Sequence, residues 1–151
     1  MAQDDWMKPI DILLVEDRPG DADLAREALE ESKFRNNLFV VDDGVKAMDF
    51  LHKKEQFADM PRPDLIILDL NLPRKDGREV LKEIKSDDHL KRIPVVILTT
   101  SKAEEDVIKT YNLHANCYIT KPLELDKFME IVNAIEHFWM NIVVLPKNQI
   151  Q

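Results

Sequence analysis

The fold of this chain is decided by the stretch Leu65-Ile66-Ile67-Leu68-Asp69, in which four apolar residues precede a carboxylate. A short apolar run without a helical period is typical of a strand buried on both faces of a parallel sheet. Three other runs have the same form, and each ends in chemically active side chains: Ile12-Leu13-Leu14-Val15-Glu16-Asp17, Val95-Val96-Ile97-Leu98-Thr99 and Tyr118-Ile119-Thr120-Lys121-Pro122. Parallel strands would bring these polar ends together at one edge of the sheet.

Strands and helices are expected to alternate along the whole chain. The apolar runs predict strands over residues 10–15, 38–41, 64–70, 94–99 and 117–120, with helices over 21–32, from 45, from 78, over 102–113 and after 122. Parallel neighbours need crossover connections, so this order predicts an α/β fold with a five-stranded parallel sheet and helices on both faces. The loop 71–77 ends in Gly77, which we expect to adopt a positive φ.

Composition limits the classes of protein to consider. The 151 residues, 44% of them apolar, suffice for one domain with a single core. A net charge of −8 disfavours binding to nucleic acid, and no apolar run approaches the ~20 residues of a membrane span. The single cysteine, Cys117, excludes an internal disulfide, and the acidic start at Asp4 and Asp5 disfavours a signal peptide. We therefore expect a cytoplasmic protein that binds neither membrane nor nucleic acid.

The polar strand ends suggest phosphoryl chemistry assisted by a metal. Glu16, Asp17 and Asp69 offer the hard oxygen ligands that Mg²⁺ prefers, and a loop carbonyl such as that of Asn71 could complete the set. Asp69 ends the most apolar run and is the best nucleophile for an acyl phosphate. Lys121 and Thr99 could bind phosphoryl oxygens, Lys121 by its charge and Thr99 by its hydroxyl.

This pattern resembles the receiver domain of two-component response regulators. Five elements recur in order over residues 10–137: Glu16-Asp17, Asp69, the Leu72-Pro73 to Asp76-Gly77 loop, Thr99 and Lys121-Pro122. The resemblance implies a flavodoxin-like fold with strand order 2-1-3-4-5. It also implies that Asp69 accepts phosphate from a sensor histidine kinase, that Tyr118 is an aromatic switch residue together with Thr99, and that Pro122 follows a cis peptide bond.

The C-terminal stretch from Phe138 to Pro146 narrows the resemblance to small stand-alone regulators associated with cyanobacterial phytochromes. We expect an N-terminal tail over 1–9, a receiver domain over 10–139 and a C-terminal extension over 140–151. An apolar stripe continues along the last helix, and exposed aromatic patches usually mark interfaces. Phe138, Trp139 and Ile142 are therefore predicted to form a homodimer interface; the alternative is a tail folded back on its own domain.

The sequence predicts a single-domain response regulator, a phosphoacceptor switch that acts on a downstream protein target and lacks an enzymatic or DNA-binding output domain. Two alternatives stay open. One is a Mg²⁺-dependent aspartate-nucleophile phosphatase of the haloacid dehalogenase kind, although Asn71 stands where that family has a second aspartate as acid and base. The other is a constitutive interaction module that keeps the fold without being phosphorylated.

Overall fold

The computed structural model describes residues 9–32, 35–100, 117–121, 126, 128–130 and 133–134. Five parallel strands form one sheet in the order β2-β1-β3-β4-β5. The strands are β1 (Ile10–Val15), β2 (Asn36–Val41), β3 (Leu65–Asp69), β4 (Val95–Thr99) and β5 (Cys117–Thr120). The predicted α/β class and strand order are confirmed.

The strand register aligns the polar strand ends. Val15 pairs with Leu68, Asp69 with Leu98, and Thr99 with Thr120. Each strand therefore finishes within about one residue of its neighbour, and the residues that follow β1, β3, β4 and β5 share one edge. This is the position at which open parallel sheets bind their ligands.

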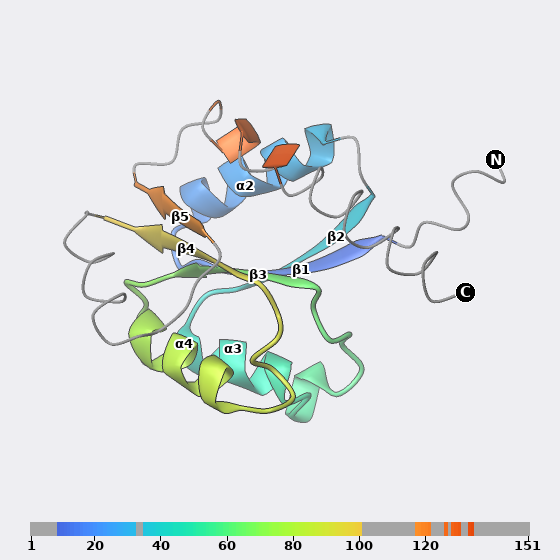
Figure 1. Cartoon of the computed structure of the whole chain (residues 1–151), viewed down its shortest axis with the longest axis vertical. Helices are drawn as coiled ribbons and strands as arrows, with labels where there is room; N and C mark the ends of the chain where they lie inside the picture. The colour runs from blue at the N-terminus through green and yellow to red at the C-terminus, as the bar shows by residue number, and fades with distance from the viewer. Residues whose placement is uncertain are drawn as a thin grey trace, which may run out of the picture.

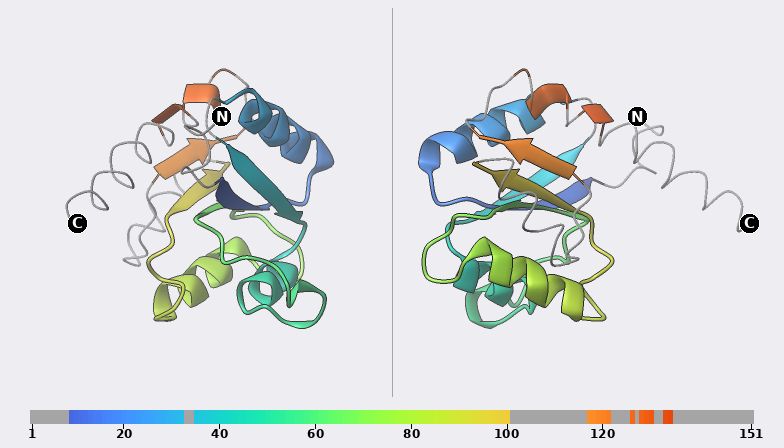
Figure 2. Two further views of the ribbon diagram at one scale, coloured as in Figure 1. Left: turned by 90° about the vertical axis from the view of Figure 1, so that its right-hand side faces the viewer. Right: turned by 60° about the vertical axis from the view of Figure 1, so that its left-hand side comes forward.

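The sheet lies between two layers of helices, as Figures 1 and 2 show. Helix α2 (Pro19–Glu31) covers one face, while α3 (Gly44–Leu51) and α4 (Gly77–Ser86) cover the other; a short 3₁₀ turn, η1 (Glu55–Phe57), follows α3. The alternating side chains of β1 divide between two cores. Ile12 and Leu14 pack with α2, whereas Leu13 and Val15 pack with α3 and α4. Burial on both faces explains why the strands are continuously apolar.

Local signals in the sequence explain where the helices begin. Pro19 occupies the first turn of α2, where its missing N–H costs no hydrogen bond. The Asp43 carboxylate accepts from Lys46 N at 2.7 Å and caps α3. Asp76 accepts from Arg78 N at 3.0 Å and caps α4 in the same way.

The prediction that Gly77 adopts a positive φ is wrong. Among the described residues no glycine has a positive φ, and in the 71–77 loop that conformation belongs to Arg74, with φ 68°. Gly77 is required for a different reason: a Cβ there would meet the carbonyl oxygen of Asp69 and would lie 2.6 Å from the Cα of Leu70. The first turn of α4 thus packs directly on the backbone that carries Asp69.

Other boundaries differ by a few residues. Strand β2 begins at Asn36, two residues before the expected Leu38, because Asn36 pairs with Ile10 and the Asn37 amide donates to Asp11 Oδ1 at 3.0 Å. The helix expected over 102–113 and most of the last helix lie outside the described residues. Within the part of the chain that the structure describes, no helix is long and apolar enough to cross a membrane.

Candidate phosphoryl and metal site

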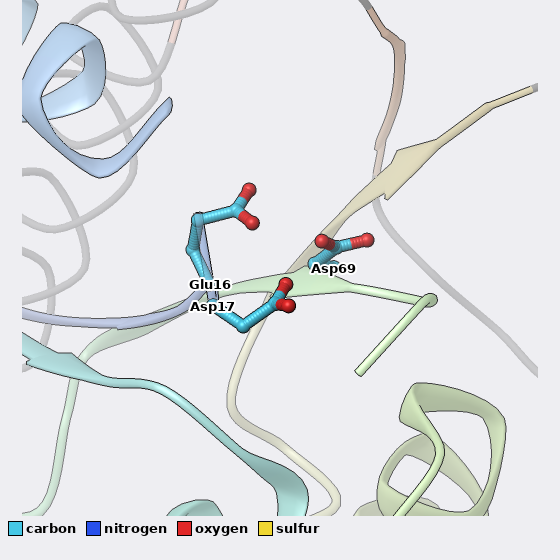
Figure 3. Close-up of side chains that lie close together, drawn as sticks. All are labelled: Glu16, Asp17 and Asp69. Carbon is cyan, nitrogen blue, oxygen red and sulfur yellow. The ribbon is translucent and has the colours of Figure 1, made fainter. Parts of the chain in front are cut away.

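Three carboxylates gather at the carboxyl edge of the sheet. Glu16 and Asp17 follow β1, and Asp69 is the last residue of β3 (Figure 3). One carboxylate oxygen from each lies within 4.8 Å of the others. Glu16 and Asp69 are buried, whereas Asp17 is exposed. Two buried acids and one open to solvent form a concave set of hard oxygen donors, which fits a small divalent cation.

Lys121, directly after β5, partly neutralises this cluster. Its Nζ lies 2.8 Å from Asp69 Oδ2, 2.9 Å from Glu16 Oε1 and 3.2 Å from Asp21 Oδ2. Burial lowers the pKa of Lys121, but the hydrogen bonds and charges of Asp69 and Glu16 outweigh burial and raise the pKa above its ordinary value. Lys121 is therefore a fixed cation at neutral pH.

Glu16 has a strongly shifted pKa. The pKa of Glu16 is raised from 4.5 to about 7, chiefly because the carboxyl is buried; Lys121 opposes this rise and the neighbouring Asp69 carboxylate adds to it. In the absence of a metal, ionisation of the buried Glu16 carboxyl is therefore unfavourable at neutral pH. A divalent cation bound beside Glu16 would favour the ionised carboxylate and lower its pKa.

The carboxylate of Asp69 is held at both oxygens. Asn71 N donates to Oδ1 at 2.9 Å, and Lys121 Nζ donates to Oδ2 at 2.8 Å. These two bonds fix the orientation of the Asp69 side chain at the sheet edge. The side chain is buried, with 1% of its surface exposed. The metal contact predicted for the Asn71 backbone carbonyl stays a prediction; the N–H of the same residue binds Asp69.

Thr99 ends β4 and is completely buried. Its hydroxyl oxygen has no hydrogen-bond partner among the residues that the structure describes. A buried hydroxyl without a partner is unfavourable by roughly 1–3 kcal/mol, and such groups commonly serve a bound ligand. Thr99 can therefore offer a donor to an anion placed at this edge.

The loop after β3 contains a strained turn next to Asp69. Lys75 N donates to the carbonyl of Pro73 at 2.7 Å across Arg74, whose φ is 68°. This is a three-residue γ-turn of the rarer hand, which stores strain in residues with a side chain. The turn packs closely on Gly44 of α3: a Cβ at Gly44 would lie 2.7 Å from Lys75 Cβ, so only glycine leaves room for the turn.

A pocket of about 540 Å³ opens at this edge and is lined by Arg18, Asp21, Asp69, Asn71, Thr100 and Lys121. Arg18, Asp21 and Thr100 were not predicted from the sequence as site residues. Asp21 could have been found from its place in the first turn of α2, since the chain enters that helix directly from the Glu16-Asp17 pair. The pocket joins the acidic cluster to solvent.

The remaining predicted site residues are placed only in part. Tyr118 of β5 is half-buried, pairs with Ile97 of β4 and packs against the core beneath α3 and α4. Pro122, Phe138, Trp139 and Ile142 lie outside the described residues. The structure thus brings together Glu16, Asp17, Asp69, Asn71, Thr99 and Lys121.

Fold and site together define a doubly wound α/β protein with a cluster of three carboxylates, partly neutralised by one lysine, at the carboxyl edge of its sheet. Residues 12–133 match the response regulator receiver domain, and the chain belongs to this family. It is a receiver-domain response regulator of two-component signalling, similar to regulators that work with phytochromes. Histidine kinases are the partners of this family.

Several relatives support this assignment. The chain is 51% identical over 143 residues to response regulator Rcp1 of Synechocystis sp., covering 95% of this chain and 97% of Rcp1. The structure of the phosphorylated cyanobacterial phytochrome response regulator RcpA superposes with a TM-score of 0.77 at 51% identity, over 89% of this chain and 96% of that one. The Mn²⁺-bound form of response regulator Rcp1 gives the same TM-score, identity and coverage.

Proposed function

We propose that Asp69 is the phosphoacceptor of this response regulator. The observation that carries the proposal is the Asp69 carboxylate itself, buried at the sheet edge, fixed by Asn71 N and Lys121, and within reach of the Glu16-Asp17 pair. A carboxylate oxygen of Asp69 would form a bond to phosphorus while the bond from phosphorus to the donor's leaving group breaks. With a kinase phosphohistidine as donor, the leaving group is the imidazole nitrogen.

Glu16, Asp17 and Asp69 are proposed to bind Mg²⁺, with the backbone carbonyl of Asn71 as a further ligand. The clustering of three carboxylate oxygens and the raised pKa of Glu16 support a cation at this place. A relative that is 51% identical binds Mn²⁺, which shares the preference of Mg²⁺ for oxygen ligands. When bound, the ion would neutralise charge on the phosphoryl oxygens during transfer.

Thr99 and Lys121 are proposed to bind the phosphoryl group once it is attached. The buried Thr99 hydroxyl lacks a partner within the described part of the chain, and Lys121 Nζ already contacts the Asp69 carboxylate. In the β4–β5 register Tyr118 stands opposite Ile97, two residues before Thr99 and on the same face of the sheet. A movement of Thr99 toward the phosphoryl group would vacate space into which Tyr118 can move. This would shift a pre-existing equilibrium between inactive and active conformations.

The proposed phosphodonor is a sensor histidine kinase, with a phytochrome as the specific candidate, since relatives of 51% identity are phytochrome response regulators. The output is proposed to be contact with a downstream protein target. Homodimerisation through Phe138, Trp139 and Ile142 stays part of the proposal. Sedimentation equilibrium that showed only monomer at high concentration, with and without phosphorylation, would contradict the dimer.

The test of the function is the intact mass after incubation with Mg²⁺ and acetyl phosphate, for the natural chain and Asp69→Asn side by side. We expect one phosphoryl adduct that requires both Mg²⁺ and Asp69. A folded natural chain without an adduct would favour the constitutive interaction module. Continuous hydrolysis of a generic phosphate ester would favour the phosphatase, although Asn71 cannot replace the second aspartate as a proton donor.

A further inference from the structure

Among the residues that the structure describes, Asp21 is the carboxylate that pairs with Lys121 from outside the three-carboxylate cluster. Its Oδ2 is 3.2 Å from Lys121 Nζ, and it projects from the first turn of α2 rather than from a strand end. Lys121 Nζ thus lies beside three carboxylate oxygens: it donates a hydrogen bond to Asp69 Oδ2 and forms ion pairs with Glu16 and Asp21. A phosphoryl oxygen that binds Lys121 would compete with these carboxylates.

The three contacts respond differently to a cation at the site. Glu16 and Asp69 are part of the cluster whose oxygens lie within 4.8 Å of one another, so a cation bound there competes with Lys121 for them. Asp21 is not part of that cluster, and its side chain is 26% exposed against 0% for Glu16 and 1% for Asp69. With a cation bound by the cluster, Asp21 would be the carboxylate that remains paired with Lys121.

Asp21 also lines the pocket by which a phosphodonor reaches Asp69. The lining contains two carboxylates, Asp21 and Asp69, and two cations, Arg18 and Lys121. A small phosphodonor such as acetyl phosphate carries negative charge, and in this pocket it would meet the partly exposed Asp21 carboxylate beside Lys121. Like charge at the mouth of a pocket lowers the local concentration of an anionic ligand.

We propose that Asp21 is a positioning residue of the phosphoryl pocket, which holds Lys121 by an ion pair on the solvent side and slows the entry of anionic phosphodonors. The proposal rests on the function proposed above for Asp69. It assigns to Asp21 an effect on the rate of phosphoryl uptake through Lys121, without contact to the reacting atoms.

A simpler role for Asp21 would be to stabilise the N-terminal end of α2 through the helix dipole. Asp23 provides the matched control, because it lies two residues later in the same helix, is exposed and does not line the pocket. Substitution of either residue by asparagine removes one negative charge from this part of α2. Only Asp21→Asn removes a contact of Lys121.

The first measurement is the rate at which acetic anhydride acylates Lys121 in the full chain with Mg²⁺, followed by peptide mass spectrometry. The other lysines serve as an internal reference. Partly exposed ion pairs of this kind are weak, so we expect Asp21→Asn to raise the rate at Lys121 about two- to five-fold over Asp23→Asn. Equal acylation rates in the two variants would show that Asp21 does not position Lys121. This readout does not depend on phosphorylation.

The second measurement is the rate of adduct formation with acetyl phosphate and Mg²⁺ at low donor concentration. Asp21→Asn should label about two- to five-fold faster than Asp23→Asn at low salt, and the difference should shrink as salt screens the charge. Equal labelling of the two variants would overturn the effect on donor entry. If no variant were labelled while Lys121 acylation still rose, the hold on Lys121 would stand and the proposed function of Asp69 would fail.

Discussion

The ammonium of Lys121 lies 2.8 Å from Oδ2 of Asp69, although the two residues are 52 positions apart in the chain. The contact joins β5 to β3 across the intervening strand β4. Because Lys121 also lies 2.9 Å from Glu16, one cation links the ends of three strands. In the absence of a metal, Lys121 is thus the main counter-charge for two buried acids.

Lys121→Met should lower the free energy of unfolding by about 2–4 kcal/mol in chelator, because it leaves Glu16 and Asp69 buried without their cation. Addition of Mg²⁺ should recover part of the loss, since a bound cation replaces the missing charge. Urea unfolding with and without Mg²⁺ measures both quantities. A control is Lys46→Met, which removes an exposed pair with Asp42 and should change stability little with or without Mg²⁺. Equal losses in the two variants would contradict the role of Lys121.

Glu16→Gln should stabilise the metal-free protein at alkaline pH. The pKa of Glu16 is raised from 4.5 to about 7, so the folded state binds more protons than the unfolded state between these values. The contribution of Glu16 to stability therefore falls as pH rises through this window and is constant above it. Glu16→Gln removes that penalty, and we expect a gain on the order of 2–3 kcal/mol at pH 8 that disappears near pH 4.5.

The measurement for Glu16 is the difference in free energy of unfolding between Glu16→Gln and the natural chain from pH 4.5 to pH 8 in chelator. Because the same titrations of other groups occur in both proteins, the difference isolates Glu16. The exposed Glu27→Gln serves as the control for loss of a surface carboxylate from the same chain. A Glu16→Gln difference that is flat or falls with pH would show that Glu16 is ionised without penalty.

The residues of the site could be predicted from sequence because parallel topology makes chain order equivalent to position. Each apolar run ends in its polar residue, so Glu16, Asp69, Thr99 and Lys121 had to meet once the strands were parallel. The place of Asp21 near the site has a sequence signal, the short step from Glu16-Asp17 into α2. Its contact with Lys121 has none, since the contact depends on how closely the first turn of α2 packs against the strand ends. The reason for a glycine at position 77 was predicted wrongly for a similar reason. Close packing of α4 on the Asp69-Leu70 backbone leaves no signal in the local sequence, whereas a glycine within a loop suggests a turn.

Gly77→Ala should be strongly destabilising. The added Cβ would lie 2.6 Å from Leu70 Cα and would also meet the carbonyl of Asp69, and backbone atoms cannot move aside as a flexible side chain can. We expect a loss of at least 2 kcal/mol in the free energy of unfolding, as is usual for overpacking against backbone. Gly20→Ala is the matched control in α2, because nothing lies within 4 Å of its Cβ position.

Gly20→Ala should gain about 0.5–1 kcal/mol from the helix preference of alanine and the smaller entropy of its unfolded chain. Thermal unfolding of both variants beside the natural chain distinguishes the two glycines. A Gly77→Ala variant as stable as Gly20→Ala would mean that α4 can separate from Leu70 at no cost, contrary to the close packing described above.

Thr99→Val should make the protein more stable and abolish its switch. The Thr99 hydroxyl is buried without a partner among the described residues, so an isosteric methyl group removes an unsatisfied donor and should add about 1 kcal/mol to the free energy of unfolding. Phosphoryl uptake at Asp69 should persist, because Thr99 holds no metal and makes no bond to Asp69 within the described structure. The response at Tyr118 should disappear, since valine has no donor for a phosphoryl oxygen.

Thr99→Ser is the matching variant, because it keeps the hydroxyl and removes only the methyl group. It should lose stability relative to the natural chain and retain the switch. The Tyr118 amide signal in NMR spectra, recorded before and after acetyl phosphate and Mg²⁺, reports the switch, while intact mass reports uptake. A phosphorylated Thr99→Val protein in which Tyr118 still shifts would place the coupling in other residues. Opposite effects of one hydroxyl on stability and switching are expected where a buried polar group is kept for a ligand that arrives only in the active state.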